Sequence, residues 1–215
     1  MLAYVCLYVA VSVFWLLLFS GYRRHLKPGT IWRVFLIGLL AGPPAGLLSA
    51  WLQSLLDIPS DALLQKFLLY FFIVGPVEEL AKFAAVFLAA IKRLDFRSSS
   101  DGIVLAVTAA LGFAMGENVL YLLSFGLEAT LPRLILGNLG HAAYALCWGY
   151  GLGVVFHEDA PFSILLGGLG LATILHGTYN FLITWNAISA IVALLLSGVL
   201  FLLLFWLTHT ESRRT

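Results

Sequence analysis

Apolar runs long enough to cross a lipid bilayer recur along the whole chain, and this restricts its fold more than any other feature. About 20 helical residues, each rising about 1.5 Å, cross the roughly 30 Å of hydrocarbon in a bilayer. Of the 215 residues, 61% are hydrophobic and 11% are charged, with a mean hydropathy of +0.99. Lipid offers backbone groups no hydrogen-bond partners, so each run is expected to be a helix. The sequence therefore predicts an all-α, polytopic membrane helix bundle.

The sequence predicts about seven transmembrane helices, one of them interrupted. The predicted spans are residues 1–21, 31–55, 63–91, 102–125, 134–156, 162–184 and 187–208. Gly75 and Pro76 lie inside the third span. Proline removes a backbone donor and disfavours helix at the preceding residue, so we expect the helix to be kinked or broken there. No linker separates the spans, and residues 1–215 are predicted to form a single transmembrane domain.

Basic residues predict the orientation of the chain. Lys66 and Arg133 are expected at one membrane surface, and the basic residues expected at the other are Arg23, Arg24, Lys27, Arg33, Lys92, Arg93, Arg97, Arg213 and Arg214. Cytoplasmic loops are enriched in lysine and arginine, so the N-terminus is predicted outside and the C-terminus in the cytoplasm. The net charge of +1 and the lack of a basic patch argue against nucleic acid as a partner.

Six ionisable residues are predicted near mid-bilayer depth, namely Glu78, Glu79, Lys82, Glu117, His141 and His176. Each such side chain costs about 2.5–3.5 kcal/mol on insertion scales, which makes these positions candidates for function. Helical spacing places Lys82 between Glu78 and Glu79 on one face. One lysine cannot neutralise two carboxylates. The excess acid must therefore share a proton, bind a metal or meet a histidine.

The polar residues of the later spans are expected at the same depth. The stretch GFAMGENVLYL places Asn118 beside Glu117, and LHGTYNF places His176 and Asn180 four residues apart on one helical face. With His141 on the fifth predicted span, all of them fall in the middle-to-outer part of the bilayer. We predict that they converge on one polar cavity.

This set of side chains meets the needs of peptide hydrolysis. That reaction requires an activated water, donors for the oxyanion and a proton for the leaving group. Glutamate acts as a base, histidine holds or polarises water, and asparagine donates to an oxyanion. No GxSxG or GxGD motif indicates serine chemistry. Two histidines with glutamates would also satisfy a catalytic zinc, but the HExxH spacing is absent, and the residues alone leave both routes open.

Four motifs follow one another on successive predicted spans: EELAK (78–82), DGIVLAVTAALGFAMGENVLYL (101–122), GHAAYALCWGYGLG (140–153) and LHGTYNFLI (175–183). This order resembles the PrsW family of bacterial membrane proteases, within the superfamily of CAAX-processing and bacteriocin-processing intramembrane proteases. The matched motifs cover roughly residues 72–185. A catalytic core of about residues 63–185 is predicted.

The resemblance implies a glutamate-dependent intramembrane endopeptidase. The catalytic residues that it implies are Glu78, Glu79, Glu117, His141, His176 and Asn180, with Lys82 and Asn118 in support. By similarity to the CAAX-processing branch, Glu78 is the general base that activates water without a metal, His176 assists, and Asn180 contributes to the oxyanion hole. No cofactor is therefore favoured. Zinc held by Glu78, His141 and His176 is the alternative.

The resemblance also implies a substrate and a location. Family members of this kind make the first (site-1) cleavage of a single-span anti-sigma factor on its extracytoplasmic side, which starts a stress response. The expected location is the bacterial cell (inner) membrane, with the lipid bilayer as surroundings. The CAAX-processing branch has arginine after its glutamate pair and a histidine closing FxxxH, whereas this chain has Lys82 and Glu117. Processing of prenylated proteins is therefore not expected.

Two other classes of protein would use the same residues. A proton- or ion-coupled membrane transporter would need a polar path to both surfaces, and no second band of ionisable residues is apparent in the inner half of the spans. A non-catalytic membrane scaffold would keep the cavity without the reaction. The endopeptidase is the favoured interpretation.

Overall fold

The computed structural model describes residues 2–20, 26–56, 59, 62–90, 96–130 and 133–185, with isolated positions beyond. Every element in these ranges is a helix: α1 (Leu2–Ser20), α2 (Pro28–Ser54), α3 (Leu63–Leu68), the π-helix η1 (Leu69–Val74), α4 (Gly75–Ala89), α5 (Ser99–Thr130), α6 (Arg133–His157) and α7 (Phe162–Thr184). The predicted all-α class is confirmed. Apart from isolated helical positions, the span predicted at residues 187–208 lies outside the described residues.

Among the described residues, four helices are long and apolar enough to cross a membrane: Pro28–Ser54 in α2, Ser99–Gly126 in α5, Gly137–His157 in α6 and Phe162–Thr184 in α7. A shorter apolar helix, Tyr4–Leu18, lies within α1. The segments α3, η1 and α4 follow one another without an intervening loop where the third span was predicted. The elements thus match the first six predicted spans.

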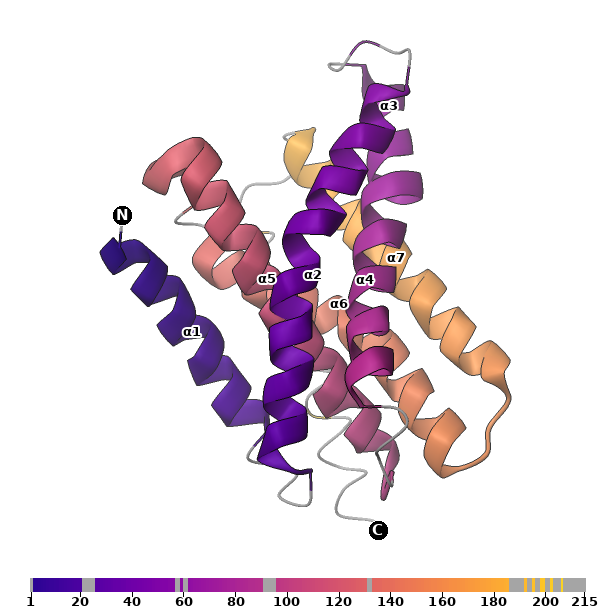
Figure 1. The fold of residues 1–215 in the computed structure, drawn as a ribbon. Helices are drawn as coiled ribbons and strands as arrows, with labels where there is room; N and C mark the ends of the chain where they lie inside the picture. The colour runs from indigo at the N-terminus through magenta and orange to yellow at the C-terminus, as the bar shows by residue number, and fades with distance from the viewer. Residues whose placement is uncertain are drawn as a thin grey trace.

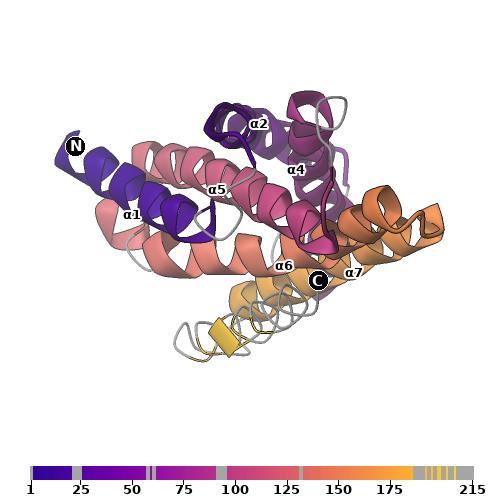
Figure 2. The same cartoon turned by 90° about the horizontal axis from the view of Figure 1, so that it is seen from below.

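Successive long helices run in alternating directions (Figure 1). Helix α5 lies in the interior, packed on α1, α2, α4 and α6, and α7 packs on α6, α4 and η1 (Figure 2). Within the apolar window of each helix, 78% of the residues of α5 are buried, against 22% for α7. The bundle is therefore built around α5, with α7 on its outside.

Glycine allows the helices around α5 to approach backbone to backbone. A Cβ atom on Gly38 would collide with the Ala109 carbonyl, and one on Gly153 with the Ser99 carbonyl. On Gly42 it would lie 2.9 Å from the Phe113 oxygen. Small residues at helix interfaces are typical of membrane bundles. Lipid provides no hydrophobic effect between helices, so close van der Waals packing holds them together.

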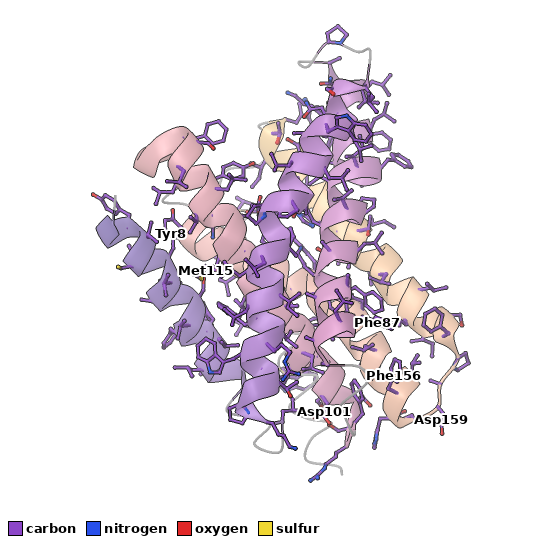
Figure 3. The ribbon with its side chains drawn as sticks, in the orientation of Figure 1. Tyr8, Phe87, Asp101, Met115, Phe156 and Asp159 are labelled. Atoms are coloured by element: carbon purple, nitrogen blue, oxygen red, sulfur yellow. The ribbon has the colours of Figure 1, made fainter. Side chains whose placement is uncertain are left out.

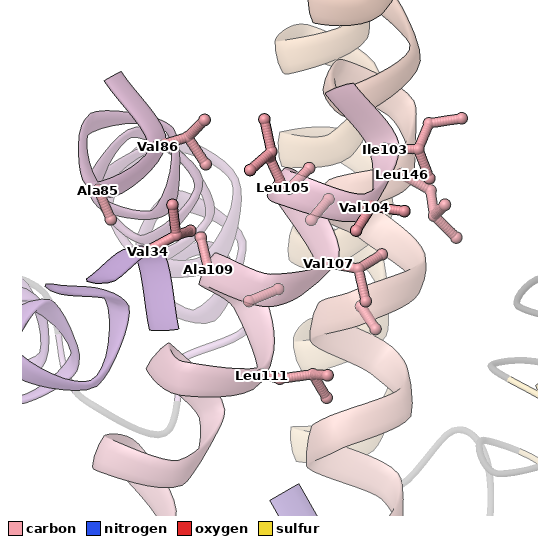
Figure 4. Packing of buried hydrophobic residues seen from close by; sticks show 14 of the residues in the cluster. Val34, Ala85, Val86, Ile103, Val104, Leu105, Val107, Ala109, Leu111 and Leu146 are labelled. Atoms are coloured by element: carbon pink, nitrogen blue, oxygen red, sulfur yellow. The ribbon is translucent and has the colours of Figure 1, made fainter. Parts of the chain in front are cut away.

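Small and branched apolar side chains fill the core where α2, α4 and α5 meet. Val34, Ala85, Val86, Leu105 and Ala109 belong to one buried cluster (Figure 4). Large apolar side chains also cover the outside of the bundle, among them Phe87 and Phe156, labelled in Figure 3. A surface of this kind suits lipid as its surroundings.

The predicted interruption at Gly75 and Pro76 takes the form of a π-helix. The six residues of η1 end at Val74, and Gly75 keeps right-handed helical angles, φ −54° and ψ −56°. Proline lacks an N–H group, and in an α-helix its ring clashes with the carbonyl four residues earlier. The wider π-helical turn just before Pro76 accommodates this ring, and the chain continues as helix into α4. Short π-helical segments frequently lie at functional sites.

Candidate active site

The six ionisable residues come from four helices. Helix α4 carries Glu78, Glu79 and Lys82 within its first eight residues, and the other three are Glu117 on α5, His141 on α6 and His176 on α7. All except Glu117 are buried, and Glu79 and Lys82 have no solvent exposure. Contacts of 2.6–3.9 Å between carboxylate oxygens and lysine or imidazole nitrogens join all six into one cluster.

Close contact between α7 and the η1–α4 junction brings His176 to the acidic residues. A Cβ atom on Gly177 would lie 2.8 Å from the Tyr70 oxygen, and one on Gly75 would lie 2.9 Å from the Thr173 oxygen. Neither position has space for a larger residue. Since Gly177 follows His176 directly, this contact places the imidazole beside the first turn of α4.

Both oxygens of the Glu79 carboxylate are hydrogen bonded. Its Oε1 atom accepts from Lys82 Nζ at 2.6 Å and from His176 Nδ1 at 2.9 Å. Its Oε2 atom accepts from Trp148 Nε1 at 3.1 Å. Glu79 therefore holds Lys82, His176 and Trp148 in place, and both of its oxygens are occupied by these hydrogen bonds.

Each histidine donates one ring N–H to a carboxylate and turns its other nitrogen toward Glu78. An ionised carboxylate only accepts hydrogen bonds, so the contacting nitrogen is the donor. His141 bonds Glu117 through Nε2 at 2.8 Å, and His176 bonds Glu79 through Nδ1. The remaining nitrogens, His141 Nδ1 and His176 Nε2, lie 3.9 and 3.6 Å from Glu78 Oε2. In the neutral form of both imidazoles these nitrogens carry lone pairs, and both lone pairs face the same carboxylate oxygen.

Aromatic rings enclose the two imidazoles. The imidazoles meet edge to face, with centroids 5.1 Å apart, and Tyr144 stacks on His176 at 5.1 Å. The Phe113 ring lies 5.6 Å from His141 and has Lys82 Nζ 4.7 Å from its centroid. These contacts restrict rotation of both histidines.

Two residues of this shell, Tyr144 and Trp148, were absent from the predicted site. Both follow His141 on α6, at intervals of three and seven residues. Side chains at these spacings share one helical face. An aromatic residue with a polar tip on the face of an intramembrane histidine is therefore the signal that would have identified them.

The structure does not bring Asn118 and Asn180 into the hydrogen-bonded cluster. Asn118 is fully buried, and Asn180 lies one helical turn beyond His176 and is partly buried. Within the described ranges, no hydrogen bond joins either side-chain amide to the six ionisable residues. Their predicted roles remain predictions.

Glu78, His141 and His176 fit a metal ion. One ligand atom from each of these buried residues lies within 4.8 Å of the other two. His141 Nδ1 is buried and has no hydrogen-bond partner in the described part of the chain. Two histidines and one carboxylate form a known catalytic zinc set, with a further position for water. Metal-binding histidines also commonly donate their second N–H to a carboxylate, as both do here.

The fold and the cluster together define a multi-pass membrane protein with a buried hydrolytic or metal-binding site. A family model described as "PrsW family intramembrane metalloprotease" matches residues 27–208. The chain therefore belongs to the PrsW family of intramembrane metalloproteases, and it is a protease. The family resemblance seen in the motifs is confirmed.

Several curated relatives carry the name Protease PrsW. One from Shouchella clausii is 34% identical over 185 residues, covering 85% of this chain and 84% of the relative. One from Halalkalibacterium halodurans is 36% identical over 161 residues, covering 74% and 72%. One from Bacillus subtilis is 32% identical over 152 residues, covering 70% and 69%. No solved structure gives a significant match.

The preference for a reaction without a cofactor is not supported. The family is described as a metalloprotease family, and three buried residues of this chain fit a metal ion. The preference came from analogy with the CAAX-processing branch. The chain also lacks the HExxH motif, which would have indicated a zinc site from the sequence. The three candidate ligands come from α4, α6 and α7, so their proximity depends on helix packing and leaves no local sequence signature.

Proposed function

We propose that this chain is a metal-dependent intramembrane endopeptidase with zinc held by Glu78, His141 and His176. The observation that carries the proposal is the orientation of the two histidines, each tied to a carboxylate through one nitrogen and turned to Glu78 with the other. Zinc, when bound, supplies a Lewis acid for the scissile carbonyl and lowers the pKa of water toward neutrality.

The charges of the cluster support a divalent ion. Glu78, Glu79 and Glu117, when ionised, carry three negative charges, and Lys82 supplies one positive charge. A neutral pair of histidines then leaves two negative charges in surroundings of low dielectric constant. Uncompensated charge is costly there, and a divalent cation would balance it.

In this proposal Glu79 and Glu117 orient the ligands. Glu79 fixes His176, Glu117 fixes His141, and Lys82 balances the buried charge of Glu79. Glu78 faces both histidines and serves as the carboxylate ligand. In a reaction without metal, Glu78 would instead be the general base that activates water, as the resemblance to the CAAX-processing branch implies.

Metal removal tests the proposal. The purified protein in detergent should cleave a single-span model substrate, lose this activity on chelation and regain it with zinc but not with magnesium, because two imidazoles favour zinc. Cleavage that continues after elemental analysis shows the metal to be gone would overturn the metal proposal and assign Glu78 the base role.

We further propose that the substrate is a single-span anti-sigma factor, cut first on its extracytoplasmic side. The site supports this through its depth. His176 lies eight residues from the end of α7, and Lys66 Nζ donates to the Thr184 oxygen at that same end. Arg33 lies at the opposite end of the helix bundle, where its guanidinium donates to the Ala89 oxygen at the end of α4.

We infer from the distribution of basic residues, under the positive-inside rule, that the end near the site faces outside. The N-terminus would then lie outside the bacterial inner membrane, and the C-terminus in the cytoplasm. Residues 63–185 would form the catalytic core, since they contain all six ionisable residues of the cluster.

Deletion of the gene tests the substrate. In the source bacterium, the full-length candidate anti-sigma factor should accumulate in the deletion strain under inducing conditions, and the product of the first cleavage should disappear. The wild-type gene should restore cleavage, and a gene encoding Glu78→Gln should not. Persistence of the same product in the deletion strain would refute this substrate.

A further inference from the structure

Trp148 hydrogen bonds the second oxygen of the Glu79 carboxylate, Oε2, whereas Lys82 and His176 both bond Oε1. Its indole Nε1 donates to Glu79 Oε2 at 3.1 Å, and the whole residue is buried. An indole N–H is only a donor, and it normally requires a partner when buried. Trp148 is neither a metal ligand nor an acid or base in the proposed function. The role of its hydrogen bond to Glu79 therefore has to be sought elsewhere.

The Trp148 hydrogen bond fixes the rotation of the Glu79 carboxylate. The terminal torsion of glutamate has a broad energy profile, and a carboxylate held through one oxygen can swing about it. With Oε1 bound to Lys82 and His176, the bond to Oε2 adds a second point of attachment in a different direction. These attachments together restrict the orientation of Oε1 toward His176 Nδ1.

The backbone around Trp148 is itself held by the neighbouring helices. A Cβ atom on Gly149 would lie 3.0 Å from the Ile103 Cα atom of α5, and one on Gly168 of α7 would lie 2.9 Å from the Trp148 Cα atom. The Phe83 ring of α4 meets the indole edge to face, with centroids 5.7 Å apart. The indole therefore has little freedom to follow Glu79 if the carboxylate moves.

We propose that Trp148 is a positioning residue for the metal site, acting through Glu79 and His176. By fixing the Glu79 carboxylate, it keeps the proton of His176 on Nδ1 and the lone pair of Nε2 directed toward Glu78. The inference rests on the proposed function, because it gives His176 Nε2 the role of a ligand atom. The predicted loss on removing this N–H is a loss of metal affinity, with the fold retained.

Zinc affinity of the purified full chain tests the inference, measured in detergent by competition with a chelating dye. Trp148→Phe removes the N–H donor and keeps an aromatic ring. Replacement of Trp148 by β-(3-benzothienyl)alanine removes the donor and keeps the bicyclic shape. Both variants should bind zinc about 10-fold more weakly, the lower end of the range for outer partners of metal ligands. Trp51→Phe, at an exposed position on α2, is the matched control and should bind as wild type.

The outcomes separate the two proposals. Absence of zinc binding by the wild-type chain would overturn the proposed function and this inference with it. Wild-type affinity in the benzothienyl variant would overturn the Trp148 inference and leave the metal site standing. If Trp148→Phe fails to fold, the benzothienyl variant decides alone, because its shape matches tryptophan. Weakened zinc affinity in a benzothienyl variant whose metal-free form stays folded is the result expected of a positioning residue. A modest fall in its unfolding midpoint is expected as well, because the buried Glu79 Oε2 atom loses its donor.

Discussion

Glu78→Gln is expected to reduce cleavage of a single-span substrate by at least about 10²- to 10⁴-fold, the range lost when a positioned acid or base group is removed. Glutamine has nearly the same shape, but its amide is neutral and a poor ligand. Glu78 is the carboxylate that both inward-facing imidazole nitrogens approach, at 3.6 and 3.9 Å. The rate should be measured with purified protein under single-turnover conditions.

Two comparisons accompany the Glu78→Gln experiment. Asp159→Asn makes the same chemical change on an exposed loop, at a φ of 53° that asparagine tolerates well, and should leave cleavage unchanged. Zinc content distinguishes the roles of Glu78, since loss of a ligand lowers both zinc binding and rate, whereas loss of a base lowers the rate alone. A folded Glu78→Gln protein that retains more than a tenth of wild-type activity would exclude either role.

Lys82→Met is expected to destabilise the bundle by about 3–5 kcal/mol, the cost of removing one partner from a buried ion pair. Lys82 Nζ lies 2.6 Å from Glu79 Oε1, and neither side chain is exposed. The substitution keeps a similar length and leaves the Glu79 charge balanced only by hydrogen bonds from His176 and Trp148. Equilibrium unfolding in mixed micelles with increasing denaturing detergent measures the free energy.

A double-mutant cycle isolates the contribution of this ion pair. Glu79→Gln combined with Lys82→Met removes both charges, so the double variant should be less destabilised than the sum of the single variants. Lys66→Met is the control, because Lys66 lies near the end of the bundle with only a 3.4 Å hydrogen bond to the Thr184 oxygen. Additive effects of the two substitutions would show that the pair contributes nothing to stability.

Much of the candidate site could be predicted from the sequence because ionisable residues are conspicuous in apolar helices. Glu78, Glu79, Lys82, Glu117, His141 and His176 were all selected on this ground, and the structure brings all six together. The predictions for the two asparagines rest on helical spacing and on the family resemblance. Spacing places a residue on a helical face, but it does not determine whether the side chain reaches a neighbouring helix.

The different surroundings of the two adjacent glutamates could not be predicted from EELAK. Both lie on one face of α4, and one lysine serves either equally well in an isolated helix. In the bundle, Glu79 meets Trp148 of α6 and His176 of α7, whereas Glu78 lies between two imidazoles. This difference depends on long-range contacts. Trp148 lies 69 positions after Glu79 in the sequence, and His176 lies 97 positions after it.

The sequence by itself determined the helical class, the first six spans and the residues that make up the cluster, because lipid imposes helix on every crossing and penalises each ionisable side chain. Only the tertiary structure decided which nitrogen faces Glu78 and that Trp148 completes the shell. These features depend on interhelical distances of a few ångströms. Close contacts at residues such as Gly75 and Gly177 set those distances, and a local sequence pattern does not encode them.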